Sequence, residues 1–352
     1  MHHDASLLDE AYTRLHRTGP EFRGYLSNHG PMAAEAIVRR GHGDVVHRWL
    51  DDYVRRLEPQ PGSLAPIGAD WAQALGDVRR VGDWTVQFAG DLREQPWQAV
   101  LNAWWPRLLP GIAAGATHGV IRVGHAVRTL LEDGESPARI AELGHGLAYW
   151  AARWLPVAAP SGAGPLTGGS RSLAEALTDI PRVPSSLGGL DEWVGRMQAV
   201  PGWEAAVAAV HIPQDPEEAR SWLADLVHTS VVRYLTHGHG EPIMLVHSVT
   251  APSAVWRALP ALDRRWWRPS ALAAWVAVSA LTAIYAPPAP AQDVALSVPT
   301  PAGAAEAAFA RAVEHGDEHV IKLADTAVEV FGRTGDVRAL AAVDRAARLI
   351  LP

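Results

Sequence analysis

Apolar residues recur every three or four positions along most of this 352-residue chain. That spacing is typical of amphipathic α-helices. Alternating apolar and polar runs bounded by Asn-Gly or Asp-Gly, which would indicate β-hairpins, are missing from the sequence. The sequence therefore predicts an all-α fold.

The predicted helices begin and end where Pro, Gly and polar residues interrupt the helical period. In the first half they cover residues 7–18, 31–41, 45–57, 71–75, 97–109, 111–131 and 137–154. In the second half they cover residues 190–200, 217–235, 242–259, 271–285, 304–315, 318–331 and 336–350. The stretch between 75 and 97 is predicted as turns, and Gly111 and Gly115 as glycines at helix contacts.

Two stretches rich in Pro and Gly, near 157–189 and 286–303, predict ordered connections or linkers. Candidate site histidines lie on both sides of the first stretch, so a shared site would require one domain. We therefore expect a single domain over residues 1–352, with many helices that enclose a buried metal and substrate cavity.

Composition narrows the classes of function. The net charge of −7 argues against a nucleic acid as partner. The absence of cysteine excludes disulfides, zinc–thiolate sites, iron–sulfur clusters and a cysteine nucleophile. Any metal must be bound by nitrogen and oxygen ligands.

The compartment is predicted from the ends and from the longest apolar run. The N-terminus has no basic region followed by an apolar stretch, so we expect a cytoplasmic protein. Residues 271–286 are uncharged, but they are fewer than the ~20 residues that a membrane span needs. They predict a buried core helix and no membrane partner.

Lys322 is the one lysine of the chain, since every other basic side chain apart from histidine is arginine. An amine can lose its proton, form a Schiff base or add carbon dioxide to become a carbamate, which a guanidinium cannot do. His319 lies one helical turn away. A solvated Lys322 paired with Glu318 or Asp325 explains the same sequence, and the segment alone leaves both interpretations open.

Several of the sixteen histidines stand in apolar surroundings. His29 immediately precedes a predicted helix, and His247 interrupts an apolar run. His118 and His125 share one helix face with Arg122, and these buried polar groups predict a polar cavity. His16 is predicted to lie at the surface. Metal motifs with fixed spacing, such as HExxH, an EF-hand or Glu-x-x-His, do not occur.

Fifteen tryptophans are many for this length. They allow a flat pocket for fused rings or plain helix packing, and packing is the simpler interpretation for most of them. The candidates for a pocket are Trp104, Trp105, Trp256, Trp266 and Trp267.

Four segments, taken in order, resemble the questin oxidase-like family of oxidoreductases from aromatic polyketide pathways. They are Asn28-His29-Gly30-Pro31-Met32, His118-Gly-Val-Ile-Arg-Val-Gly-His125, Leu245-Val-His247-Ser-Val-Thr and Asp317-Glu-His319-Val-Ile-Lys322. The resemblance spans residues 25 to 325, which is nearly the whole chain.

The resemblance implies an all-α oxygenase with mononuclear non-heme Fe(II) that acts with O2 on anthraquinone-like substrates. It implies ring opening of the Baeyer–Villiger type. The implied metal ligands are His29, His118, His247, His319 and a CO2-derived carbamate on Lys322. In fungal-type members a tyrosine matches His125 and a histidine matches Arg122, so the resemblance places these two residues around the metal, where they assist catalysis.

Other functions remain open at this point. A zinc-dependent hydrolase or isomerase could use the same ligands, and a non-catalytic binder of aromatic metabolites would need no metal. A plain helical scaffold would tolerate Lys322→Arg without effect. The sequence leaves open the exact substrate, a requirement for NADPH and the oligomeric state.

Overall fold

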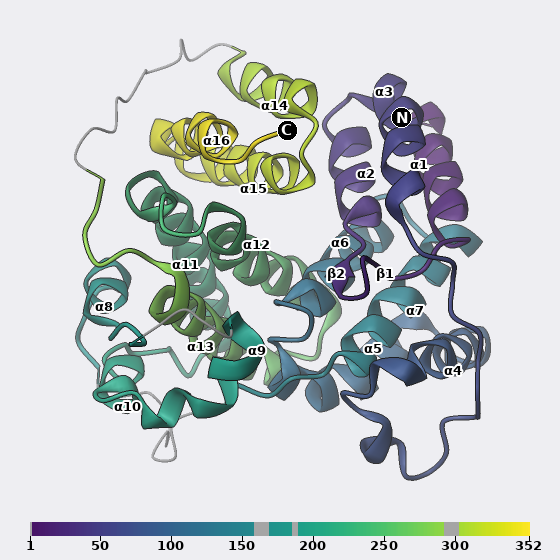
Figure 1. Ribbon diagram of the computed structural model, residues 1–352, viewed down its shortest axis with the longest axis horizontal. Helices are drawn as coiled ribbons and strands as arrows, with labels where there is room; N and C mark the ends of the chain where they lie inside the picture. Colours follow the sequence, from purple (N-terminus) through teal and green to yellow (C-terminus); the bar gives the residue numbers. More distant parts are fainter. Residues whose placement is uncertain (1, 158–168, 185–188, 292–302) are drawn as a thin grey trace. The chain divides into compact units, whose positions relative to one another are not determined.

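The computed structural model describes residues 2–157, 169–184, 189–291 and 303–352. Within these ranges it contains sixteen α-helices, several short 3-10 helices and one two-stranded sheet, so the predicted all-α fold is confirmed (Figure 1). The chain divides into two compact units, residues 1–155 with 257–263 and residues 156–256 with 264–352. The predicted single domain stays a prediction.

Unit 1 contains the first seven helices and the small sheet. The helices are α1 (His2–Leu15), α2 (Gly30–Arg39), α3 (Gly43–Tyr53), α4 (Val81–Glu94), α5 (Trp97–Leu108), α6 (His118–Glu132) and α7 (Pro137–Ala152). The strands β1 (Glu21–Phe22) and β2 (Leu26–Ser27) pair antiparallel within the connection before α2.

The centre of unit 1 is α7, which packs against both α4 and α6. A Cβ atom on Gly119 would lie 2.8 Å from the Cβ atom of Trp150, so glycine at this position lets α6 and α7 approach closely. Thirteen residues in a row on α6, from His118 to Leu130, are buried. Polar side chains on this helix therefore need partners inside the unit.

Helix α4 was not predicted, and its region was assigned to turns, which is wrong. Gly82, Asp83 and Gly90 resemble turn residues, but Val81, Trp84 and Phe88 follow the helical period and are buried. Burial of these apolar residues outweighs the weak local preference of the glycines.

The predicted start of α6 near residue 111 is also wrong, because the helix begins at His118. Gly115, Ala116 and Thr117 have φ angles of +52°, +55° and +70°. Three successive left-handed residues cannot continue a right-handed helix.

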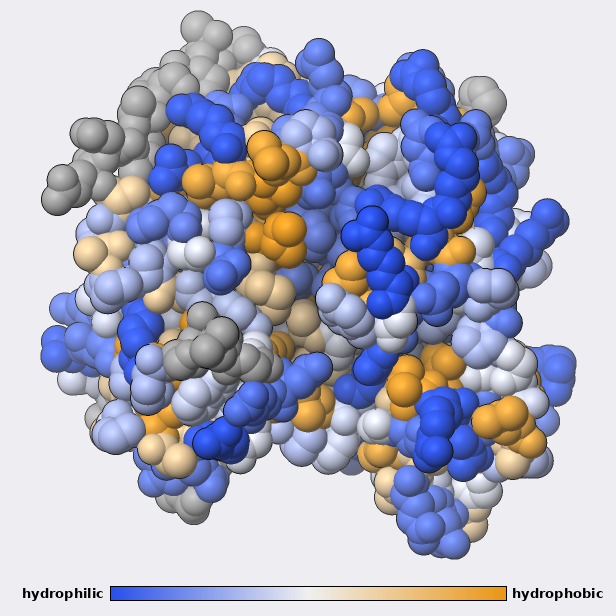
Figure 2. Space-filling model, viewed as in Figure 1, coloured by the Kyte–Doolittle hydropathy of each residue, from blue (hydrophilic) through white to orange (hydrophobic). Residues whose placement is uncertain are grey.

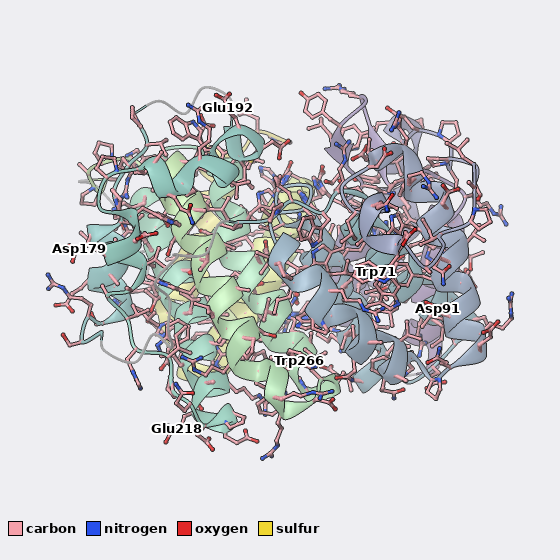
Figure 3. The ribbon with its side chains drawn as sticks, turned by 90° about the horizontal axis from the view of Figure 1, so that it is seen from below. Trp71, Asp91, Asp179, Glu192, Glu218 and Trp266 are labelled. Carbon is pink, nitrogen blue, oxygen red and sulfur yellow. The ribbon has the colours of Figure 1, made fainter. Side chains whose placement is uncertain are left out.

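The tryptophan clusters of unit 1 are helix packing. Trp104 contacts Trp84 and Phe88 edge to face, with ring centroids 5.4 and 5.0 Å apart. Its Nε1 donates to Oδ2 of Asp91 at 3.2 Å. Asp91 and Trp71 are both labelled in Figure 3. For Trp104, the packing interpretation of the sequence is therefore confirmed.

Unit 2 contains the remaining nine described helices, except for the last two residues of α12. They are α8 (Leu173–Asp179), α9 (Gly189–Trp193), α10 (Trp203–Val207), α11 (Pro216–His237), α12 (Pro242–Ala258), α13 (Trp267–Tyr285), α14 (Ala304–His315), α15 (Glu318–Thr334) and α16 (Val337–Leu349). The predicted helix at 190–200 is wrong in part, since α9 gives way to a 3-10 helix over Val194–Ala199. The short helices α8 and α10 were not predicted.

Helix α15 is covered by neighbours on several sides. It packs against α14, α16 and α11, and Figure 1 shows the three C-terminal helices together. Every residue from Glu318 to Ala327 is buried. The sequence left open a solvated Lys322 on this helix, but the first turns of α15 have no solvated face.

Parts of both predicted connections, at 158–168, 185–188 and 292–302, lie outside the described residues. The first connection also contains α8, which begins with a capping box between Ser172 and Glu175. None of the described helices is both long and apolar enough to cross a membrane. Residues 271–284 on α13 are mostly buried, as predicted for a core helix.

Candidate metal centre

His29 is held by a tightly bonded turn at the start of α2. Its backbone N–H donates to the Tyr53 hydroxyl at 2.6 Å. Asn28 bridges the turn, since its Oδ1 accepts from Gly30 N at 2.9 Å and its Nδ2 donates to Gly19 O at 3.0 Å. These bonds fix the backbone from which the buried His29 ring projects.

His118 follows directly on the three left-handed residues. Positive φ is unusual for Ala116 and especially for the β-branched Thr117, and such strain is often found at functional sites. His118 Nδ1 lies 2.6 Å from the carbonyl oxygen of Gly115. Because a carbonyl only accepts, Nδ1 carries the proton and Nε2 carries the lone pair that a metal needs.

The rings of His29 and His118 stack, with centroids 4.3 Å apart and 23° between their planes. Both residues are about 5% exposed. Two positive charges at this distance in a buried site are unfavourable, so at most one of the two rings carries a charge. Neutral imidazoles are the form that coordinates metals.

The second histidine pair is in unit 2 and combines α12 with α15. The His247 and His319 rings meet edge to face, with centroids 5.7 Å apart. Asp317 caps α15 by accepting from the backbone N–H groups of His319 and Val320. Its Oδ1 also lies 3.4 Å from His319 Nδ1, which directs Nε2 of that ring away from the carboxylate.

Lys322 is completely buried, which rules out the interpretation of a solvated surface lysine. Burial lowers the pKa of Lys322 to about 8, although Glu318 and Asp317 act in the opposite direction. Relative to an ordinary lysine, this increases the unprotonated amine at neutral pH by roughly 300-fold. An unprotonated amine is what both metal binding and carbamate formation require.

Arg122 is paired with a buried carboxylate that the sequence did not single out. Its Nε and Nη2 donate to the two oxygens of Glu142 at 2.5 and 2.9 Å. His16 Nε2 lies 2.8 Å from Glu142 Oε2, so its predicted surface position is wrong. The guanidinium charge is therefore balanced within unit 1.

His125 belongs to a separate buried network around Glu35. Its Nδ1 lies 2.8 Å from Glu35 Oε2, and a carboxylate only accepts, so Nδ1 carries the proton. Arg128 and Arg39 donate to the same carboxylate. Burial lowers the pKa of His125 and keeps the ring neutral, although Glu35 raises the pKa.

Glu35 and Glu142 are not among the residues predicted from the sequence as partners of Arg122 and His125. Each is a single acidic residue within an apolar helical run, a signal that could have identified them. With these two carboxylates present, Arg122 and His125 are satisfied by ion pairs and hydrogen bonds. The sequence predicted a polar cavity because Arg122 and His125 are buried. Their burial no longer requires such a cavity, since both side chains have partners within the protein.

The Arg122–Glu142 pair makes a testable prediction about acid stability. Burial alone would raise the pKa of Glu142, but Arg122 and His16 outweigh it and lower the pKa to about 2. The folded value is below the ordinary value of 4.5, so this stabilisation is present above pH ~4.5 and is lost toward pH ~2. In urea titrations, the unfolding free energy should fall by on the order of 3 kcal/mol more in wild type than in Glu142→Gln over this range. Equal slopes for the two proteins would contradict the assignment.

A comparison with family models covers most of the chain. A family model described as questin oxidase-like matches residues 44–327, which is most of the chain. The chain belongs to the questin oxidase-like family. The matched range includes His118, His247, His319 and Lys322, while His29 precedes it. Comparisons with curated proteins and with solved structures gave no match.

Membership in the questin oxidase-like family makes this protein an oxidoreductase and suggests polyketide-type substrates. The predicted ligands, which are four histidines and Lys322, suit a first-row transition metal, because imidazole nitrogens and an amine or carbamate are suitable ligands. Oxygen atoms of Gly115 and Asp317 orient two of the rings, as expected around a metal. The sequence predicts that both histidine pairs bind one metal ion. The pairs belong to different units, and this stays a prediction.

Proposed function

We propose that this protein is a non-heme Fe(II)-dependent oxygenase that uses O2 to open or oxygenate a ring of an anthraquinone-like polyketide. The family match over residues 44–327 carries the proposal. The two buried histidine pairs and the completely buried lysine support it.

The proposed ligands are His29, His118, His247 and His319, together with Lys322 as a carbamate. Iron, when bound, supplies the electrons that overcome the slow reaction of O2 with an organic ring. The chain's own part is to present imidazoles in fixed orientations. Ring partners at Gly115 and Asp317 do this for His118 and His319.

Two further residues have distinct roles in this proposal. His125 donates through Nδ1 to Glu35, and its Nε2, which lies 3.4 Å from Nη1 of Arg257, can take a proton from a substrate phenol only after that guanidinium moves aside. Both Nε and Nη2 of Arg122 donate to Glu142, so Arg122 does not contact substrate in this proposal. Its role is to help position His118, which lies one turn away on α6. The buried surroundings of these groups exclude water from the reaction.

Metal analysis combined with oxygen uptake tests the proposal. Protein purified without oxygen and loaded with Fe(II) should contain one iron per chain and consume O2 only with an anthraquinone-type substrate. His118→Ala and His247→Ala, one from each unit, should both lose the ion if the pairs share it. His239→Ala, at an exposed position, is the matched control.

Three results would reject parts of the proposal. Iron retention by either ligand variant would exclude the shared site. Substrate turnover with zinc and without O2 consumption would favour the hydrolase or isomerase. Tight binding of an aromatic ligand by metal-free protein, with no turnover, would favour a non-catalytic binder.

A further inference from the structure

On the face drawn in Figure 2, apolar residues of the described chain form small patches separated by polar ones. A broad apolar surface, of the kind that marks a large protein interface, is not seen among the described residues of that face. The interior of unit 1, in contrast, contains a network of buried side chains beside the turn that precedes His118. It consists of Glu21, Ser27 and Tyr149, with Arg153 at its edge.

The β1–β2 hairpin places Glu21 and Ser27 side by side. The two residues are direct partners in the antiparallel pairing, so their side chains project from the same face of the hairpin. Both contact the hydroxyl of Tyr149 on α7. Ser27 Oγ lies 2.6 Å from Tyr149 Oη, and Oη lies 3.1 Å from Glu21 Oε1. Arg153 donates to both oxygens of Glu21, at 2.6 and 2.7 Å, and balances its charge.

The direction of each hydrogen bond in this network follows from the chemistry of its members. A carboxylate only accepts, so Tyr149 donates to Glu21, and the Tyr149 oxygen accepts from the Ser27 hydroxyl. Burial and the charge of Glu21 raise the pKa of Tyr149, so its hydroxyl keeps the proton that it donates. The Tyr149 hydroxyl is therefore fixed from two sides inside the unit.

Tyr149 packs directly against Gly115, which lies three residues before His118. A Cβ atom on Gly115 would lie 2.6 Å from the Tyr149 hydroxyl oxygen, so only glycine permits this contact. Ser27 Oγ lies 3.5 Å from the carbonyl oxygen of Gly115. The same carbonyl oxygen lies 2.6 Å from Nδ1 of His118 and accepts its proton. The network thus contacts the residue whose carbonyl orients the His118 ring.

The turn from Gly115 to Thr117 depends on such contacts. All three residues are left-handed, although Ala116 and Thr117 are not glycine, and a strained turn persists only where its surroundings hold it. The Thr117 hydroxyl is buried and makes no hydrogen bond with a described residue, so it does not stabilise the turn. The three atoms nearest to a Cβ on Gly115 all belong to Tyr149.

We propose that Tyr149 is a positioning residue for His118. Its fixed hydroxyl holds the Gly115 carbonyl against Nδ1 of His118, which leaves Nε2 for the metal, a role that rests on the proposed metal site. The hairpin that fixes this hydroxyl continues directly into His29. Movement of the hairpin would therefore disturb both rings of the stacked pair, and the Tyr149 hydroxyl connects the supports of the two rings.

NMR of the metal-free protein with ¹⁵N-labelled histidine tests the positioning itself. In wild type His118 should carry its proton on Nδ1, and that proton should exchange slowly with water. His118→Ala identifies the resonance by its loss. Tyr149→Phe removes only the hydroxyl, and it should give a mixture of both ring tautomers and faster exchange, because the Gly115 carbonyl is no longer held. Tyr12→Phe is the matched control, since the buried Tyr12 hydroxyl contacts Thr129.

Anaerobic titration with Co(II), whose visible absorption reports its ligands, tests the consequence for metal binding. Tyr149→Phe should bind Co(II) ~10–100-fold more weakly than wild type, the effect of disturbing the partner of a ligating histidine. Ser27→Ala removes the donor to Tyr149 and should weaken binding in the same direction. Tyr12→Phe should bind Co(II) as wild type does. Urea unfolding of each variant separates these effects from a general loss of stability.

The assignment of Tyr149 is overturned if the His118 ring spectrum is unchanged in Tyr149→Phe, or if this variant binds Co(II) as tightly as wild type. An equal loss of affinity in Tyr12→Phe would also overturn it, because the effect would then be one of packing in general. If Tyr149→Phe does not fold, Ser27→Ala decides by the same two measurements. Wild type that binds no Co(II) would instead reject the proposed metal site, and the metal-free spectra would still decide whether Tyr149 positions His118.

Discussion

Lys322→Met is expected to release the metal and to reduce oxygen consumption by at least ~100-fold while the protein stays folded. Lys322 is completely buried, and methionine retains much of its apolar length. Removal of an ionisable group from an apolar site should leave the unfolding free energy unchanged or raise it. Iron content, oxygen uptake and urea unfolding measure the three effects separately.

The single lysine makes the carbamate directly observable. With ¹³C-labelled CO2, wild type should give one side-chain carbamate resonance by NMR, and Lys322→Met should lack it. Lys322→Arg is the matched variant, because it keeps a positive charge but cannot form a carbamate. Full iron content and activity in Lys322→Arg would remove this residue from the proposed ligand set, and so would a wild-type spectrum without the resonance.

Glu35→Gln is expected to destabilise the protein by ~3–5 kcal/mol, the effect of breaking a buried ion pair. Glu35 is fully buried, and it accepts hydrogen bonds from Arg128, Arg39 and His125. Burial on its own would raise the pKa of Glu35, but Arg128 and His125 outweigh it and lower the pKa well below its ordinary value. Glutamine keeps the shape and leaves the Arg128 charge buried without its counter-ion. Urea unfolding at pH 7 measures the loss.

Two further variants separate the ion pair from simple packing. Glu35→Gln combined with Arg128→Met should recover part of the lost stability, because the unbalanced charge is removed. Glu192→Gln removes an exposed pair with Arg196, and should cost less than ~0.5 kcal/mol. If Glu35→Gln costs no more than this control, the carboxylate is not the counter-ion that stabilises α2 against α6.

For the site, the sequence identified the histidines and Lys322 as unusual, and the resemblance predicted the family that the comparison confirmed. It could not decide whether Lys322 is solvated, because Glu318 and Asp325 stand at the spacing of a surface ion pair. The complete burial of Lys322 within the first turns of α15 decided that question. The spacing of apolar residues along a helix does not reveal which other segments of the chain pack against its polar face.

The same limit applies to the buried carboxylates. Glu35 contacts His125 across 90 positions, and Glu142 contacts Arg122 from the next helix. Such pairs depend on how helices pack, and a spacing rule reaches only three or four residues. The missed helix α4 is a different case, because Val81, Trp84 and Phe88 carried the period and the turn-like glycines obscured it.

The sequence by itself determined that the chain is helical, where most helices lie, and which side chains can carry metal chemistry. These properties follow from local periodicity and from residue chemistry. Tertiary structure alone decided which histidines form pairs, which carboxylates accept hydrogen bonds from Arg122 and His125, and that Lys322 is buried. These are contacts between segments far apart in the chain, and their energy depends on burial and distance in space.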